Sequence, residues 1–316
     1  MAVVNTGTPV AGGSVPGAVA AEPVDNPGYK EVTPLALLRR RVVGHTGLLI
    51  GGTILLVILL MAVLAPLLPL HDPYAQDLSK RLIAPVWDAK GTWEHPLGTD
   101  AFGRDYLSRI MYGAQVSLLI GFAAMAISGI IGTAMGIAAG YFGGRVDMII
   151  TLFVTTRLAM PAILIALAVV ALIGSSLQIV IIVLGLLIWD RFAVVVRAAT
   201  QQVRGLDYIA AAEAVGCSRW RILATEILPN IANPLIVVAT LEVAHAILLE
   251  AALSFLGLGV QPPTPSWGLM ISEGKGFMFF MPWVICIPGF ALFALVMSIN
   301  LMGDGLRDVT APENRS

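Results

Sequence analysis

Residues 206–230 read LDYIAAAEAVGCSRWRILATEILPN, and this stretch lies between two long apolar runs. Its pattern predicts a short helix, a break and a second helix. Asp207 and Ser218 can cap the two helices, whereas Gly216 and Pro229 can end them. A membrane protein has little reason to fold a helical elbow outside the bilayer unless another protein binds it. We therefore expect residues 206–230, called the elbow below, to be a docking site; an ordinary interhelical loop is the competing interpretation.

The composition around the elbow is that of a membrane protein. The chain has 316 residues, of which 57% are hydrophobic and 12% charged, whereas soluble domains carry about 25% charged residues. The formal net charge of -1 provides no basic field for nucleic acid, so no nucleic-acid partner is expected. The two cysteines, Cys217 in the elbow and Cys286 in an apolar run, are not expected to form a disulfide or a metal site.

The apolar runs predict an all-α, polytopic membrane protein with six transmembrane helices. The first run contains 25 uncharged residues, roughly 38 Å as a helix, and the hydrocarbon core of a bilayer is about 30 Å thick. The expected spans are 46–70, 116–139, 148–173, 177–196, 234–255 and 283–302. The expected organisation is a Gly- and Pro-rich, disordered tail at 1–40, a first transmembrane helix at 41–70, an extracytoplasmic loop at 71–112, a five-helix core at 113–303 and a tail at 304–316.

Lysine and arginine residues indicate the orientation of these spans. Eleven lie on the side of the elbow and the two termini, and six lie on the other side, five of them in the loop at 71–112. Because cytoplasmic segments carry the excess of these residues, the elbow and both termini are expected to be cytoplasmic.

The chain lacks the sequence signatures of a nucleotide site. Its four lysines all lie outside a G-x-x-x-x-G-K-[ST] loop, and neither H-E-x-x-H nor G-x-S-x-G is present. Transport driven by ATP would therefore take its energy from another chain. This chain is not expected to be an enzyme or to hold a cofactor.

The elbow resembles the cytoplasmic coupling loop, or EAA loop, of bacterial ABC importer permeases. Five residues match it: Ala211, Ala212, Gly216, Leu228 and Pro229. Ala210 stands where the family has a glutamate, and Glu213 lies one turn further on. In the family this loop places a short helix in a groove on the ATPase. The coupling residues that the resemblance and the caps imply are Asp207, Ala211, Ala212, Glu213, Gly216, Ser218, Leu228 and Pro229.

Three further segments narrow the resemblance. Residues 95–118, 246–274 and 300–315 look like the C-type permease of dipeptide, oligopeptide and nickel ABC importers. This resemblance implies a type-I importer fold with a MetI-like core in a bacterial inner membrane. The partners it implies are a homologous second permease, one or two ABC ATPase subunits that hold ATP and Mg, an extracytoplasmic peptide-binding protein and the lipid bilayer.

Two outer segments are candidates for contact with the binding protein. In the first segment, turn-forming residues surround Asp100, Arg104 and Asp105. The second segment contains Trp267 and is stiffened by three prolines, one of which is Pro263. The first segment could instead form a folded cap over the entrance of a span, and the prolines of the second could serve loop rigidity alone. Trp267 is also expected at the bilayer interface.

Ionisable residues inside spans carry a functional hypothesis by default. Glu242 and His245 are three residues apart and share a helix face, so we expect them to face a pore or to pair with a neighbouring helix. Glu250 lies nearer the outer end, where gate contacts are expected. A di-iron site would need a second E-x-x-H, which the chain lacks, so no metal is expected here.

Other residues in the spans are expected to determine packing. Asp190 and Arg191 are expected to pair with Arg157 or with the second permease. Small residues along the second span allow another helix to approach closely: Gly129, Gly132, Gly136 and Gly140.

The sequence thus predicts the permease subunit of an ATP-driven importer of di- and oligopeptides that forms half of the translocation path. A permease for nickel or another small solute would share this architecture; the twelve Met and four His residues are scattered, which favours peptides. Two different classes of protein also fit an apolar chain of this kind. One is a membrane redox or metal enzyme using Glu242, His245 and Glu250, and the second is a passive channel.

Overall fold

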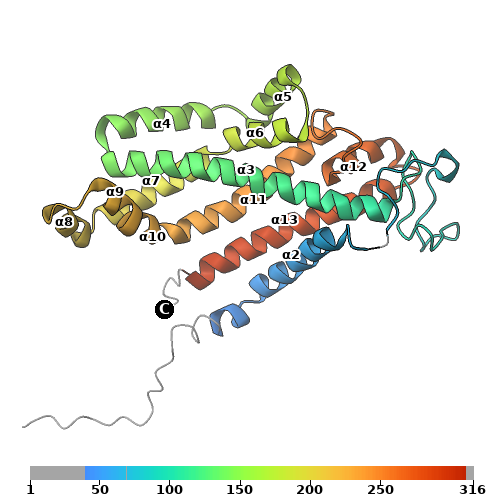
Figure 1. The fold of residues 1–316 in the computed structure, drawn as a ribbon, viewed down its shortest axis with the longest axis horizontal. Coiled ribbons are helices and arrows are strands. Elements are labelled where there is room, and N and C mark those ends of the chain that lie inside the picture. The colour runs from blue at the N-terminus through green and yellow to red at the C-terminus, as the bar shows by residue number, and fades with distance from the viewer. Residues whose placement is uncertain (1–39, 69, 311–316) are drawn as a thin grey trace, which may run out of the picture.

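The computed structural model describes residues 40–68 and 70–310, and over this range the protein is a bundle of helices (Figure 1). Its β-pairing in that range is limited to an isolated bridge between Thr99 and Asp105. The longest helices are α2 (Thr46–Leu64), α3 (Tyr106–Phe142), α11 (Ala232–Phe255) and α13 (Trp283–Thr310). Shorter helices are α4 (Gly144–Leu158), α5 (Ala162–Ile173), α6 (Leu177–Leu187), α7 (Asp190–Arg204), α8 (Asp207–Ala214) and α12 (Trp267–Gly274). The short turns are η1 (Leu78–Lys80), α9 (Arg219–Arg221), η2 (Ile222–Ile227), α10 (Leu228–Asn230) and η3 (Lys275–Phe277).

The helices confirm the prediction of an all-α membrane protein. Five segments are long and apolar enough to cross a membrane, and there are six if the bent pair α4–α5 counts as one span. One of the five is Leu177–Arg204, in which α6 passes into α7. The first span is shorter than expected, since α2 ends at Leu64 shortly before Pro66.

The third span is not the straight helix expected over 148–173. It is broken between α4 and α5, whose axes meet at 83°. Pro161 is the N-cap of α5, and the residue before a proline is disfavoured in the helical conformation. The apolar pattern continues across this break, so hydrophobicity alone did not reveal it.

The glycines of the second span bring α3 and α7 into backbone contact, which confirms the packing prediction. A methyl group on Gly132 would lie 2.3 Å from the carbonyl oxygen of Trp189. Methyl groups on Gly136 and Gly140 would each lie 2.8 Å from a carbonyl oxygen of α7. Only residues without a side chain allow this distance between two helices.

Helix α13 packs against α2 and continues past the expected end at residue 302. A methyl group on Gly51 of α2 would lie 2.7 Å from the carbonyl oxygen of Ser298. His45, which caps α2, pairs with Asp308 at 3.1 Å. The tail expected at 304–316 is therefore helical as far as Thr310; residues 311–316 and the tail expected at 1–40, apart from Arg40, lie outside the described range.

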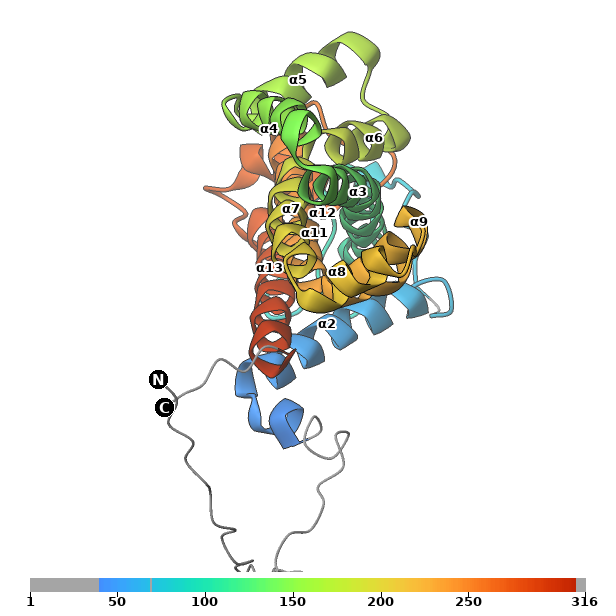
Figure 2. The same cartoon turned by 90° about the vertical axis from the view of Figure 1, so that its left-hand side faces the viewer.

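The two ends of the bundle differ in structure. Helices α8 and α9 of the elbow lie at one end, and the long loop between α2 and α3 lies at the other (Figure 1). Figure 2 looks at the bundle from the elbow end, with α4 and α5 on one side and α2 on the other. The bundle thus separates the elbow from the predicted extracytoplasmic loop by the length of α3.

Candidate functional site

The first half of the elbow folds as the sequence predicts, with one correction. Helix α8 ends before Gly216, whose φ of +84° is a left-handed conformation that glycine adopts without strain. Ser218 caps the second helix, since its side chain accepts a hydrogen bond from the Arg221 N–H. Asp207 does not cap α8: Leu206 is the N-cap, and Asp207 is the first helical residue. A carboxylate there still interacts favourably with the helix dipole.

The second half of the elbow corrects the prediction for Pro229. The helix that begins at Arg219 continues through a π-helical segment, η2, and through Pro229 to Asn230. In a regular α-helix the proline ring clashes with the carbonyl four residues earlier. The wider turns of η2, directly before Pro229, relieve this clash. Pro229 therefore shapes the helix without stopping it.

The elbow has its own small core and an exposed outer surface. Ile209, Ile222 and Ile227 are buried against the ends of α3 and α7. The Tyr141 hydroxyl of α3 donates a hydrogen bond to Glu213 at 3.1 Å. Trp220 is 82% exposed and borders an apolar hollow of about 320 Å³ between α3 and the elbow. Sequence reasoning missed Trp220, although a tryptophan in a water-facing segment is a typical interface residue.

Seven of the eight predicted coupling residues are exposed at the surface, and one is half-buried. Ala212 is half-buried and contacts the small core of the elbow. The remaining seven are exposed at the elbow end of the bundle: Asp207, Ala211, Glu213, Gly216, Ser218, Leu228 and Pro229.

Glu242 is the centre of an ionic cluster inside the bundle. Its carboxylate is fully buried, and its two oxygens lie 3.1 Å from an Arg191 nitrogen and 3.1 Å from His245 Nδ1. Arg191 belongs to α7, so Glu242 pairs with a neighbouring helix, one of the two arrangements expected, whereas His245 pairs with Glu242 within α11. The expected pairing of Asp190 with Arg157 is absent among the described residues. Arg157 donates instead to the carbonyl oxygens of Met160 and Leu187.

Glu250 lies in the packing between α11 and α12. It is buried, and its Oε1 accepts hydrogen bonds from the hydroxyls of Ser254 (2.7 Å) and Ser266 (2.9 Å). These partners differ from those of Glu242 and His245. The three residues that a membrane metal enzyme would require therefore do not form one cluster.

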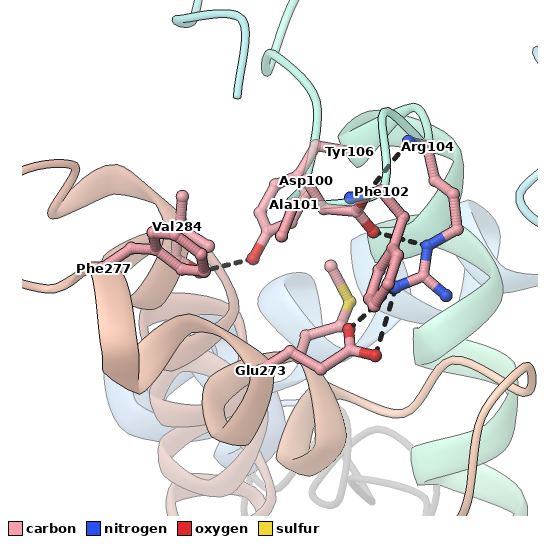
Figure 3. Close-up of a pocket in the computed structure, with 9 residues that line it drawn as sticks. Asp100, Ala101, Phe102, Arg104, Tyr106, Glu273, Phe277 and Val284 are labelled. Atoms are coloured by element: carbon pink, nitrogen blue, oxygen red, sulfur yellow. Dashed lines mark hydrogen bonds and ion pairs between the residues drawn. The ribbon is translucent and has the colours of Figure 1, made fainter. Parts of the chain in front are cut away.

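At the opposite end of the molecule, the polar residues expected to meet a binding protein are buried. The Arg104 guanidinium lies 2.6 Å from an Asp100 carboxylate oxygen and 3.1 Å from a Glu273 carboxylate oxygen. The three residues line a pocket of about 320 Å³ (Figure 3). Arg109 also pairs with Glu273, at 2.8 Å. Asp105 caps α3 by accepting from the Ser108 N–H. With Asp100, Arg104 and Asp105 at most 3% exposed, their side chains build a folded cap and offer no direct contact surface.

The proline-rich segment is divided between surface and interior. Pro263 is exposed. Trp267 is fully buried, and its indole N–H donates to the carbonyl oxygen of Ile110 at 2.9 Å. The expectation that Trp267 lies at the bilayer interface, or touches another protein, is wrong, because its side chain packs α12 against α3.

The outer loop also carries exposed ionic contacts. Lys80 donates to Glu94 at 2.6 Å. This hydrogen bond lowers the pKa of the Glu94 carboxyl and raises the pKa of the Lys80 ammonium. Both groups are therefore charged near neutral pH.

Comparison with known protein families assigns this chain to a family of transport proteins. The family model for the binding-protein-dependent transport system inner membrane component matches residues 132–316. The chain belongs to this family. A second model, the N-terminal TM domain of oligopeptide transport permease C, matches residues 33–85 of this inner membrane component. The resemblance seen in the sequence is thereby confirmed.

Individual relatives cover nearly the whole inner membrane component. The dipeptide transport system permease protein of Haemophilus influenzae is 39% identical over 269 residues, 85% of this chain and 91% of the relative. The di/tripeptide transport system permease protein of Pseudomonas aeruginosa is 38% identical over 291 residues, 92% of this chain and 96% of the relative. A chain of the MetNI methionine ABC transporter in an inward-facing conformation superposes on this chain with a TM-score of 0.52 at 20% sequence identity. The superposed region covers 64% of this chain and 96% of the transporter chain. That likeness shows the fold alone: the core is that of an ABC importer permease.

Proposed function

We propose that this inner membrane component is the permease subunit of an ATP-driven importer of di- and oligopeptides. The observation that carries the proposal is the similarity to permeases named for dipeptides and for di/tripeptides, which extends over 85% or more of the chain. A homologous second permease supplies the other half of the translocation path. The chain breaks no bond itself, and ATP and Mg are held by one or two partner ATPases.

The elbow is the proposed coupling element. Its exposed surface combines a helix end at Gly216 with the apolar side chains of Val215 and Trp220, which suits a helix-in-groove contact with an ATPase. Ala210 replaces the glutamate of the family, so shape and apolar contact carry the interaction. ATP-driven closure of the ATPases then favours one orientation of the membrane helices over the other.

The proposed orientation places the elbow and both termini in the cytoplasm of a bacterial cell. The excess of Lys and Arg on that side supports it. The opposite end then faces the extracytoplasmic peptide-binding protein. Asp100, Arg104 and Asp105 are buried, so their side chains do not contact the binding protein. The binding protein instead meets exposed residues such as Pro263 and the outer surface of the cap that the three buried residues hold in shape.

Uptake measurements test the substrate. In vesicles that contain the assembled transporter and its binding protein, a labelled dipeptide should accumulate only when ATP is present on the side of the ATPases. Uptake of nickel with no uptake of peptides would refute the peptide assignment and support a small-solute permease. Accumulation that needs no ATP would support a passive channel.

A pair of tryptophan variants tests the coupling surface. We expect Trp220→Asp to abolish co-purification of the ATPase and peptide uptake, because the charge would enter the apolar contact. Trp93→Asp is the matched control for ATPase co-purification, since Trp93 is equally exposed, at 82%, and belongs to the loop between α2 and α3, which lies at the opposite end of the bundle (Figure 1). Normal ATPase binding by Trp220→Asp would remove the elbow from the interface.

A further inference from the structure

Three potential metal ligands meet in the loop between α2 and α3. His71 follows the first span, and Glu94 and His95 precede α3. One ligand atom from each lies within 4.8 Å of the other two. The chain thus brings two imidazoles and a carboxylate together, in a loop that lies at the end of the bundle opposite the elbow (Figure 1).

His95 has the environment of a metal-binding histidine. Its side chain is 5% exposed, and its Nδ1 lies 2.8 Å from Asp105 Oδ1. A carboxylate at that distance favours the neutral tautomer in which Nδ1–H donates a hydrogen bond to Asp105, and in this tautomer the lone pair is on Nε2. Among the described residues, Nε2 is buried without a hydrogen-bond partner. Histidines that bind metals typically donate their other ring N–H to a carboxylate in this way.

The other two ligands can close around the same point. The side chains of His71 and Glu94 are 52% and 56% exposed, so both can change rotamer. Glu94 Oε1 lies 3.9 Å from His95 Nε2, and the two imidazole rings are 4.8 Å apart between centroids. Ligand atoms around a tetrahedral zinc ion with bonds of about 2.0–2.1 Å are roughly 3.3 Å apart. Movements of about 1 Å therefore complete the coordination.

A lysine is already the positive partner of Glu94. The Lys80 ammonium lies 2.6 Å from Glu94 Oε1, while the second carboxylate of the group, Asp105, bonds His95. Lys80 is partly exposed and can turn into solvent. A divalent ion would then replace the ammonium as the positive partner of Glu94.

We propose that His71, Glu94 and His95 bind a first-row divalent transition-metal ion, with Zn²⁺ the best fit to two imidazoles and one carboxylate. Asp105 orients His95. Because Asp105 also caps α3, the ion fastens the chain that leaves the first span to the start of the second. The site lies in the outer loop, apart from the ionic cluster of Glu242, and does not depend on which solute is transported.

Metal titration of the full-length protein tests the proposal. The protein is purified in lipid nanodiscs, stripped with a chelator and titrated with Zn²⁺ against a chromophoric competitor. We expect one Zn²⁺ per chain, and at least about tenfold weaker binding in His71→Gln and Glu94→Gln, since even an outer partner of a ligand contributes 10- to 100-fold. Lys80→Met should bind Zn²⁺ more tightly than the unmodified protein.

Controls separate this site from non-specific binding and from misfolding. Asp88→Asn, which removes an exposed carboxylate of the same loop, should leave Zn²⁺ affinity unchanged. Without metal, His71→Gln and Glu94→Gln should melt at the temperature of the unmodified protein, and Zn²⁺ should raise that temperature less in these two variants than in the unmodified protein or in Asp88→Asn. Absence of stoichiometric Zn²⁺, or equal affinity in all these variants, overturns the proposal. Labelled Zn²⁺ that enters vesicles and is released inside would assign the site to cargo and contradict a fastening ion.

Discussion

At the scale of single residues, Glu242 shows how the bundle holds a charge. Both of its oxygens are engaged, one by Arg191 and one by His245, and the carboxylate is fully buried. Arg191 is different, because 54% of its side chain is exposed. The two members of the pair should therefore respond differently when the partner is removed.

We expect Arg191→Met to lower the free energy of unfolding by about 3 kcal/mol, because it leaves a buried carboxylate short of a partner. Glu242→Gln should have a smaller effect, since the Arg191 guanidinium can reach solvent or headgroups. Denaturation of both variants in the same detergent measures the difference. Arg145→Met, at an exposed position, controls for loss of a positive charge, and equal losses in the first two variants would contradict the asymmetry.

At the scale of elements, the bundle depends on the contact between α3 and α7. Gly132 and Gly136 place the backbone of one helix against carbonyl groups of the other. Alanine is the better helix former, so the glycines are retained for space. The face of α3 that carries Gly132 and Gly136 should therefore not accommodate a side chain, even one as small as a methyl group.

Gly132→Ala should destabilise the protein by about 1–3 kcal/mol, the usual cost of overpacking. Gly129→Ala is the control on the same helix, because its methyl group would lie 3.4 Å from the ring of Phe192, an ordinary van der Waals distance. Thermal unfolding in nanodiscs checks both. A neutral Gly132→Ala would mean that α3 and α7 can separate freely.

The elements also show which features a sequence can reveal. Local signals predicted the Ser218 cap, the break at Gly216 and the glycine face of α3, since these depend on neighbouring residues. Partners distant in the chain could not be inferred: Glu273 is 164 residues from Arg109, and Ile110 is 157 residues from Trp267. The burial of Trp267 and of the outer charges follows from such contacts. Pro161 was a usable local signal for the broken third span.

At the scale of the whole molecule, the elbow and the outer loop occupy opposite ends (Figure 1). The proposed function requires one end in the cytoplasm and the other on the extracytoplasmic side of the membrane. The two native cysteines provide a route to this orientation. Cys217 lies in the elbow, and Cys286 lies in α13.

Labelling should resolve the orientation. In a Cys286→Ser background, a membrane-impermeant maleimide should label Cys217 only after the cells are opened. Asp88→Cys combined with Cys217→Ser and Cys286→Ser should be labelled in intact cells. Labelling of Cys217 in intact cells would reverse the assignment of both ends.

Helix α3 also has the proportions of a lever arm. It contains 37 residues, about 56 Å, and its backbone contacts with α7 lie near the elbow. From Gly136 the helix extends roughly 9 Å toward the elbow and roughly 45 Å toward the outer loop. A rigid rotation of α3 about this off-centre point would amplify a displacement about fivefold. In such a rigid rotation, a movement of about 1 Å at the elbow end of α3 would correspond to about 5 Å at its capped end, close to one helical turn.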